Sequence, residues 1–240
     1  MRRTAGVSPP SYESAGAWTV DRAVRAMATA CARQSRGVPP AVALTLAPQR
    51  VLVHLTSPDQ WPPPAWSVAD EGRTWWIDLE QVRNAPIEHG IAEPFPRLVS
   101  LGVTGAGRIL LNLAAADGVI SVEGDAVRAY GLVQAWATRL TTSPWSAGLR
   151  VVQVGFASDD SHADLAEAAS PLNDPGGGVL MLAGAPENRD LEYITWLAGE
   201  RHRGWTIVVL GADDARWRLT VDASGKVETG LLDEPVRLRA

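Results

Sequence analysis

Apolar residues recur with a helical period early in the chain and predict a helix from Thr19 or Asp21 to about Arg36. Thr19 or Asp21 can serve as the N-cap, because both side chains accept hydrogen bonds from the first turn. The apolar stripe consists of Val24, Met27, Ala28 and Cys31. The stretch 37–40, Gly-Val-Pro-Pro, ends the helix. Residues 1–18 are rich in Ser, Pro, Gly and Ala without a period, which predicts a flexible N-terminal segment.

Short runs of alternating or continuous apolar residues follow this helix. They predict strands over residues 41–46, 51–55 and 74–79. Residues 57–66 hold prolines at 58, 62, 63 and 64 together with two tryptophans, so we expect an irregular loop there. The helix and these strands predict a small α+β subdomain over residues 19–92.

The rest of the chain alternates between strand and helix patterns and predicts an α/β domain over residues 93–240. A hairpin is expected over 98–112, and a second hairpin closes the chain over 216–231. Between them we expect strands at 119–122, 151–154, 179–182 and 206–210, and helices at 124–140, 163–169 and 191–200. These strands are continuous apolar runs, as in sheets buried on both faces. We therefore predict a three-layer α/β fold with a mixed, mostly parallel sheet.

Composition excludes several function classes. The formal net charge is −5, and the sequence shows no basic patch of the kind that nucleic-acid binding requires. No apolar run approaches the ~20 residues of a membrane span, and the N-terminus lacks a signal core, so a cytoplasmic location is expected. Cys31 is the only cysteine and is expected in the core. The histidines lack metal-ligand spacing, so we predict no metal site and no cofactor; they are His54, His89, His162 and His202.

The most informative stretch for chemistry is the strand at 119–122, which leads through Gly124 directly into a helix. This is the layout of a phosphate-binding loop, in which helix N-terminal amides face the anion. A working loop then needs a second Gly, a Lys and a Ser or Thr, but Ala129, Tyr130 and Gly131 stand there. Acidic residues at 123 and 125 would repel phosphate. The pattern resembles a degenerate phosphate loop, with Gly124, Asp125 and Arg128 as ligand-binding candidates, although a plain strand-to-helix turn is the favoured alternative.

Two further groups of residues are candidates for binding. Asp213 and Asp214 follow the strand at 206–210, where acidic residues hold magnesium in nucleotide hydrolases, although a solvated turn is the favoured alternative. Trp61, Trp66 and Trp75 lie in or near the proline-rich loop and predict an aromatic partner-binding face. Core packing beneath a long loop is the favoured alternative for the tryptophans.

Several short segments of the sequence carry a family resemblance. They are residues 95–102, 109–113, 118–124, 142–145, 149–156, 217–225 and 236–240. Their order resembles a region of large actinobacterial membrane proteins that combine a LysM peptidoglycan-binding module with a bacterial transcriptional activator (BTAD-like) domain. The resemblance covers about residues 20–240, most firmly 95–240. Neither of those two modules is visible in this chain, so neither glycan binding nor DNA binding is assigned to it.

The central stretch also looks like the ATPase core of DNA translocases and type VII secretion motors. In those motors a strand pair leads to a phosphate loop, and this sequence departs from them at the loop itself. The resemblance therefore implies a cytoplasmic, motor-like fold without hydrolysis, and no catalytic residue carries over.

These observations favour a non-enzymatic function. The leading hypothesis is a regulatory or scaffolding domain that contacts protein partners, as one module of a membrane-anchored protein, with its oligomeric state left open. One alternative is a nucleotide-binding domain that uses Gly124 and the following amides without a lysine. A second alternative is a DNA-associated transcriptional regulator module.

Overall fold

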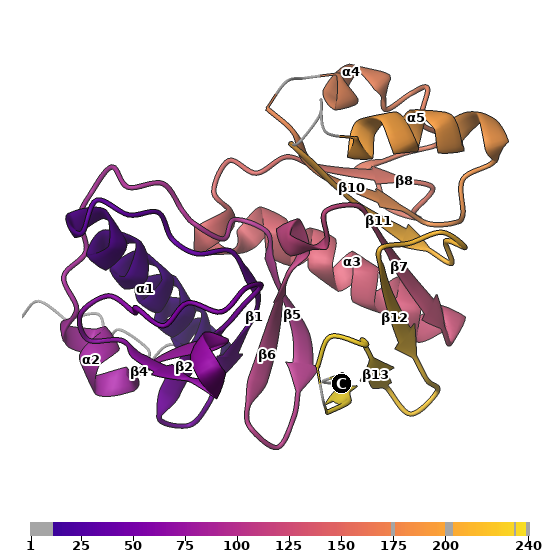
Figure 1. Ribbon diagram of the computed structural model, residues 1–240. Coiled ribbons are helices and arrows are strands. Elements are labelled where there is room, and N and C mark those ends of the chain that lie inside the picture. The colour runs from indigo at the N-terminus through magenta and orange to yellow at the C-terminus, as the bar shows by residue number, and fades with distance from the viewer. Residues whose placement is uncertain (1–11, 174–175, 200–203, 233, 239–240) are drawn as a thin grey trace, which may run out of the picture.

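The computed structural model describes residues 12–173, 176–199, 204–232 and 234–238 (Figure 1). The first part of the chain forms the helices α1 (Tyr12–Arg33) and α2 (Leu79–Asn84), and the strands β1 (Ala41–Leu46), β2 (Arg50–Leu55), β3 (Ser67–Ala69), β4 (Thr74–Asp78), β5 (Leu98–Val103) and β6 (Arg108–Asn112). The remaining strands are β7 (Val119–Gly124), β8 (Val151–Val154), β9 (Ser161–His162), β10 (Gly178–Leu182), β11 (Trp205–Leu210), β12 (Trp217–Val221), β13 (Lys226–Glu228) and β14 (Val236–Arg237). The remaining helices are α3 (Ala126–Thr142), α4 (Ala169–Leu172) and α5 (Asn188–Ala198), and short 3-10 turns are η1 (Asp70–Gly72), η2 (Leu113–Ala116) and η3 (Pro144–Ser146).

The first helix begins earlier than its sequence pattern predicts. α1 starts at Tyr12, well before the predicted cap at Thr19, so the end of the aperiodic stretch is helical. Residues 1–11 of the predicted flexible segment lie outside the described residues. The next element agrees with its prediction, because β1 covers residues 41–46 as expected.

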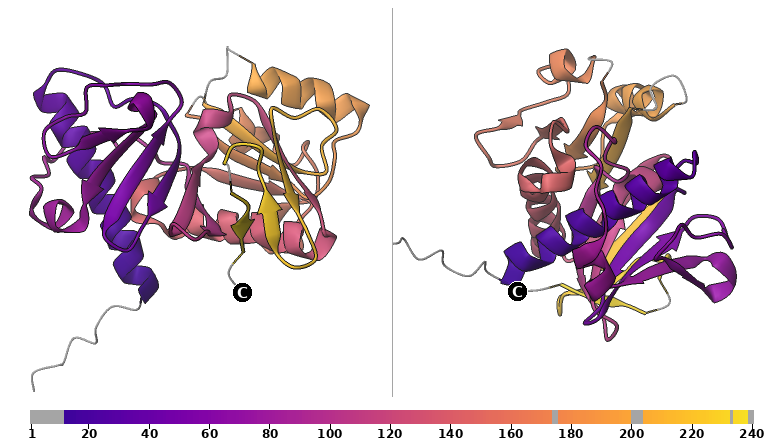
Figure 2. Two further views of the ribbon diagram at one scale, coloured as in Figure 1. Left: turned by 60° about the horizontal axis from the view of Figure 1, so that its bottom comes forward. Right: turned by 90° about the vertical axis from the view of Figure 1, so that its left-hand side faces the viewer.

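All described strands join one mixed sheet of 14 strands. Their order is β3-β4-β2-β1-β6-β5-β14-β13-β12-β7-β11-β10-β8-β9. From β3 to β12 every neighbouring pair is antiparallel, whereas the pairs from β12 to β9 are parallel. Figure 2 shows α1 and the first strands grouped on one side of the molecule, and the parallel strands with α5 on the other.

The predicted fold class, a three-layer and mostly parallel α/β fold of the phosphate-loop type, is wrong. The sheet is mostly antiparallel, because the expected small subdomain and the C-terminal strands pair into the same sheet as the parallel strands. The strands β1–β6 are joined to the C-terminal strands by a single bridge, between Arg237 of β14 and Val103 of β5. The continuous apolar runs do form parallel strands, namely β7, β8, β10 and β11, but they are a minority of the sheet.

Three clusters of buried side chains form the core. One surrounds α3 and the middle of the sheet and includes the fully buried Trp136. A second lies between α1 and the first strands and includes Trp75 and Cys31. The third lies beneath α4 and α5 on the parallel strands. The helices therefore cover separate parts of one sheet.

The short connection from β11 to β12 crosses β7 without a helix. Both strands pair with β7 in parallel, and the crossing backbone is bonded at each end, from the Gly211 N–H to the Val122 carbonyl at 3.0 Å and from the Arg216 N–H to the Val119 carbonyl at 2.8 Å. Ala212 in this connection is buried in the cluster beneath α5. Ser121 of β7 is fully buried, and by strand alternation it points to the same side as Val119, which packs on that cluster. A small side chain at this position leaves room for the crossing chain.

Among the described residues, no helix has both the length and the apolar character needed to cross a membrane.

We predict that acid destabilises the protein through His54 on β2. Its Nε2 lies 2.8 Å from the Thr45 hydroxyl and its Nδ1 3.5 Å from the Thr74 hydroxyl. Burial lowers the pKa of His54 below its ordinary 6.5, and this outweighs the opposing effect of Asp70. Above pH 6.5 the ring is neutral in both states. Below pH 6.5 the unfolded chain takes up a proton at a higher pH than the folded protein does. The free energy of unfolding therefore decreases as the pH is lowered, by at most about 1.4 kcal/mol per pH unit.

Urea unfolding of the wild type and His54→Gln between pH 7.5 and 5.0 measures this effect. The wild type should lose stability below pH 6.5 more steeply than the variant, which lacks the titrating ring. Parallel pH profiles for the two proteins would contradict the assignment.

Candidate functional site

Gly124, the centre of the predicted phosphate loop, is explained by sheet packing. It is the last residue of β7 and pairs with Val221 of β12. Its φ is +102°, and a Cβ built on it would lie 2.1 Å from the Val221 carbonyl oxygen. The two strands approach too closely here for any side chain. This approach accounts for the glycine, and no ligand is needed to explain it.

The first turn of α3 is closed by its own cap. The Asp125 N–H donates to the Val221 carbonyl at 2.7 Å, and the Asp125 carboxylate accepts from the Arg128 N–H at 3.0 Å. Arg128 turns its guanidinium to the Ala223 carbonyl, with Nε at 2.9 Å. The capping carboxylate occupies the position where a phosphate would meet the helix amides. The phosphate-loop prediction is therefore wrong, and the arrangement gives no support to nucleotide binding.

Of the acidic residues near this edge of the sheet, Glu123 has a structural partner. Arg218 forms an ion pair with Glu123 at 2.5 Å and donates to the Asp213 carbonyl at 2.7 Å. Asp213 and Asp214 are exposed in the turn that follows β11, as in the solvated-turn alternative. Within the described parts of the chain, no group of three or more His, Cys, Asp or Glu side chains could hold a metal ion.

The three candidate tryptophans do not form one face. Trp66 is 6% exposed and Trp75 is fully buried, so both belong to the core beneath the loop. Trp61 is 79% exposed, more than either of the other two tryptophans on the exposed surface that the structure describes, Trp18 at 50% and Trp196 at 47%. Of the predicted aromatic face, only the Trp61 side chain is therefore exposed.

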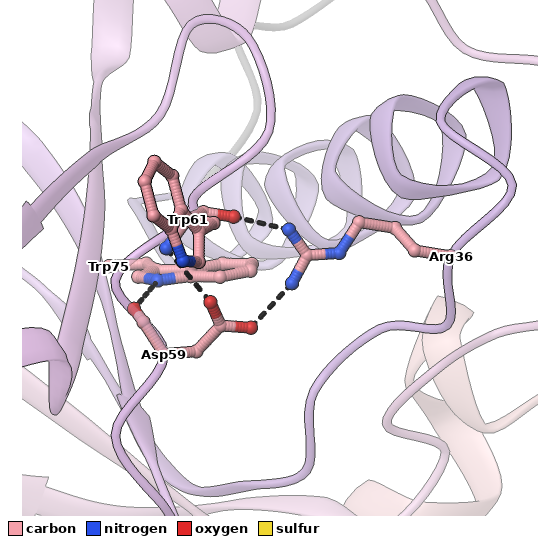
Figure 3. Close-up of polar contacts among 4 residues, drawn as sticks. All are labelled: Arg36, Asp59, Trp61 and Trp75. Atoms are coloured by element: carbon pink, nitrogen blue, oxygen red, sulfur yellow. Dashed lines mark hydrogen bonds and ion pairs between the residues drawn. The ribbon is translucent and has the colours of Figure 1, made fainter.

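A network of polar contacts holds the backbone beneath the Trp61 ring (Figure 3). Asp59 is its centre: its carboxylate accepts from the Trp61 N–H at 2.9 Å and forms an ion pair with Arg36. The Asp59 carbonyl accepts from the Trp75 indole N–H at 2.8 Å, and its N–H donates to the Gly72 carbonyl at 2.9 Å. Each polar group of Asp59 therefore ties the loop to a different segment.

Arg36 ties the loop to the end of α1. Besides its ion pair with Asp59, its guanidinium donates to the Trp61 carbonyl and lies 5.2 Å from the ring centroid of the buried Trp75. This stacking over an aromatic face adds a cation–π attraction to the hydrogen bonds. The side chains of Arg36 and Asp59 are only 28% and 23% exposed, so the pair is partly shielded from solvent.

The sequence contains part of the signal for this site. An Asp two residues before Trp61 favours a turn closed by the Asp side chain, and the three prolines that follow restrict the chain further. The residues around Arg36 do not indicate its role, because it binds a loop more than twenty residues away in sequence. The exposure of the ring is likewise set by the fold.

No protein-family model matches the sequence, and a search of the curated proteins finds no match. The resemblance to LysM and transcriptional-activator proteins stays an untested expectation, and no association with either module is proposed.

We predict that Gly124→Ala destabilises the protein strongly. The added methyl group would collide with the Val221 carbonyl, and the positive φ adds backbone strain, for a total on the order of 3 kcal/mol. Gly131→Ala in α3 is the matched control, because its Cβ would meet nothing within 4 Å. It should stabilise the helix by up to about 1 kcal/mol. Urea denaturation compares the three proteins, and an unchanged midpoint for Gly124→Ala would show that glycine is not required by the sheet.

Proposed function

We propose that this chain is a non-catalytic scaffolding or regulatory domain that binds a protein partner through Trp61. The observation that carries the proposal is an indole 79% exposed to solvent on a backbone fixed at both its N–H and its carbonyl. Cys31 is a buried free thiol, as in proteins of reducing compartments, and the proposal places the domain in the cytoplasm.

The energetics of burial support an interaction role for this ring. Covering an indole removes roughly 150–250 Å² from water. At ~25 cal/mol per Å² this amounts to about 4–6 kcal/mol before the losses of association. Because the Arg36–Asp59 network already holds the loop, little backbone entropy remains to be lost when a partner binds. A rigidly held, exposed aromatic side chain is typical of the anchor residues that dominate protein interfaces.

The surroundings of Trp61 indicate what kind of surface it would meet. Pro64 and Ala65 of the same loop are exposed, as is Val68 on the edge strand β3, which is 38% exposed. The charges of Arg36 and Asp59 already neutralise one another. We therefore expect the partner to present an apolar pocket, with an acceptor for the indole N–H.

Two other tryptophans are exposed but differ from Trp61. Trp18 is 50% exposed and lies against the Arg22 guanidinium, 5.6 Å from its ring centroid. Trp196 of α5 is 47% exposed and stacks on Tyr193 at 5.6 Å. Each covers part of its own helix, whereas the Trp61 ring projects from a loop. Trp196 therefore provides a matched control on the opposite part of the sheet.

The test places a photo-crosslinking phenylalanine analogue at position 61, and in parallel at position 196, in the cells that naturally produce the protein. Position 61 should give a discrete adduct that position 196 does not give. The partner identified in that adduct is then titrated calorimetrically against the purified wild type and variants. Trp61→Ala should weaken binding at least ~30-fold, as expected for an anchor worth about 2 kcal/mol. Trp196→Ala should leave it unchanged.

A second variant separates the ring from its support. Arg36→Met keeps Trp61 but removes the ion pair and the bond to the Trp61 carbonyl, so affinity should fall while the indole is still present. Identical adducts at positions 61 and 196, or a Trp61→Ala variant with wild-type affinity, would refute the proposal.

A further inference from the structure

The strand β3 forms one edge of the sheet. It pairs with β4 on one side, and no strand in the described part of the chain pairs with it on the other. An edge strand presents backbone N–H and C=O groups to which a further strand can bind. Natural sheets often protect such edges with charged side chains or proline, but β3 reads Ser-Val-Ala and carries neither.

The register of β4 shows which backbone groups of β3 face outward. The Leu55 N–H at the end of β2 donates to the Arg73 carbonyl, just before β4, at 2.8 Å. Backbone groups alternate in direction along an antiparallel strand, so Trp75 also faces β2, and its two neighbours face β3. Val68 lies opposite Trp75. The Val68 N–H and C=O therefore point away from β4, and neither has a hydrogen-bond partner among the residues that the structure describes.

Val68 and the Trp61 loop lie on the same face of the sheet. Residues directly opposite one another in an antiparallel pair place their side chains on one face, so Val68 shares a face with Trp75. The Trp75 indole N–H donates to the Asp59 carbonyl at 2.8 Å, which holds the loop at that face. A chain that paired with Val68 would therefore lie at the edge of the face that carries the Trp61 loop.

The turn that follows β3 is fixed to the same loop. The Asp59 N–H donates to the Gly72 carbonyl at 2.9 Å. The backbone on both sides of β3 is strained, because φ is positive at Ala65 before it and at Asp70 and Glu71 after it. Such conformations persist only where the surrounding structure imposes them, and they cluster at functional sites. β3 is thus held in place before a partner binds, which reduces the entropy lost on binding.

We infer that the protein partner of Trp61 adds an extended segment to β3, hydrogen-bonded to the Val68 N–H and C=O. This inference rests on the proposed function and names the conformation that the partner adopts at that site. In recognition of this kind, backbone hydrogen bonds align the added strand and side-chain contacts give specificity. Because β3 has only three residues, few backbone bonds can form, so the Trp61 indole supplies most of the affinity.

The experiment begins with a displayed library of disulfide-closed peptides of about 14 residues, because closure favours paired extended strands. Selection on the full chain with counter-selection on Trp61→Ala retains the peptides that depend on Trp61. Their affinities are then measured by fluorescence anisotropy for two variants at position 68. Val68→Pro removes the outward N–H and is compatible with an edge strand, whereas Val68→Ala keeps the N–H.

Val68→Pro should bind the peptides at least about tenfold more weakly than the wild type, and Val68→Ala at most about threefold more weakly. Val127→Ala on α3 is the matched control, because it shortens another exposed valine, 82% exposed, away from β3. It should leave the affinity unchanged. Equal urea midpoints for Val68→Pro and the wild type verify that the variant is folded.

Hydrogen exchange tests the same bond without a substitution. In the wild type, followed by NMR, the Val68 N–H should exchange at least about tenfold more slowly when the peptide is bound, because a backbone hydrogen bond protects it. The N–H groups of Ser67 and Ala69 already face β4 and should change less.

The outcomes separate this inference from the proposed function. A Val68 N–H that stays unprotected in the complex, or equal affinities for Val68→Pro and the wild type, would overturn the inference while the Trp61 site stands. A selection without Trp61-dependent peptides would overturn both. Dimers of the chain that Val68→Pro abolishes would assign the edge to a second copy and would overturn the inference as well.

Discussion

The structure depends on β5, the strand at which the N-terminal strands of the sheet meet the C-terminal strands. Only the short strand β14 links it to the C-terminal strands, and Gly102 makes this approach feasible. A Cβ on that glycine would lie 2.3 Å from the Arg237 carbonyl oxygen. Two buried indoles reinforce the junction. The Trp136 N–H donates to the Ser100 carbonyl at 2.9 Å, and the Trp145 N–H to the Leu98 carbonyl at 3.0 Å.

Arg97, immediately before β5, adds a second tie across the same junction. Its guanidinium donates to the Thr206 hydroxyl at 2.9 Å and to the Gly204 carbonyl, both at the start of β11. Burial lowers the pKa of this arginine. A charged group taken from water is expensive unless it is hydrogen-bonded, so these two acceptors are part of what allows Arg97 to remain there. The N-terminal and C-terminal parts of the sheet are therefore tied together at two places, by the β14–β5 bridge and by Arg97.

The sequence by itself determined where apolar runs make strands and helices, as with β1, because periodicity is a property of neighbouring residues. It also indicated a strand that leads through Gly124 into a helix. The reason for this glycine is the close approach of Val221, which lies nearly one hundred residues away in sequence. The joining of the antiparallel strands to the parallel ones in one sheet, the burial of Trp75 beside the exposure of Trp61, and the role of Arg36 were likewise decided by the tertiary structure. Each depends on contacts between distant segments, and such contacts leave no periodic trace in the chain.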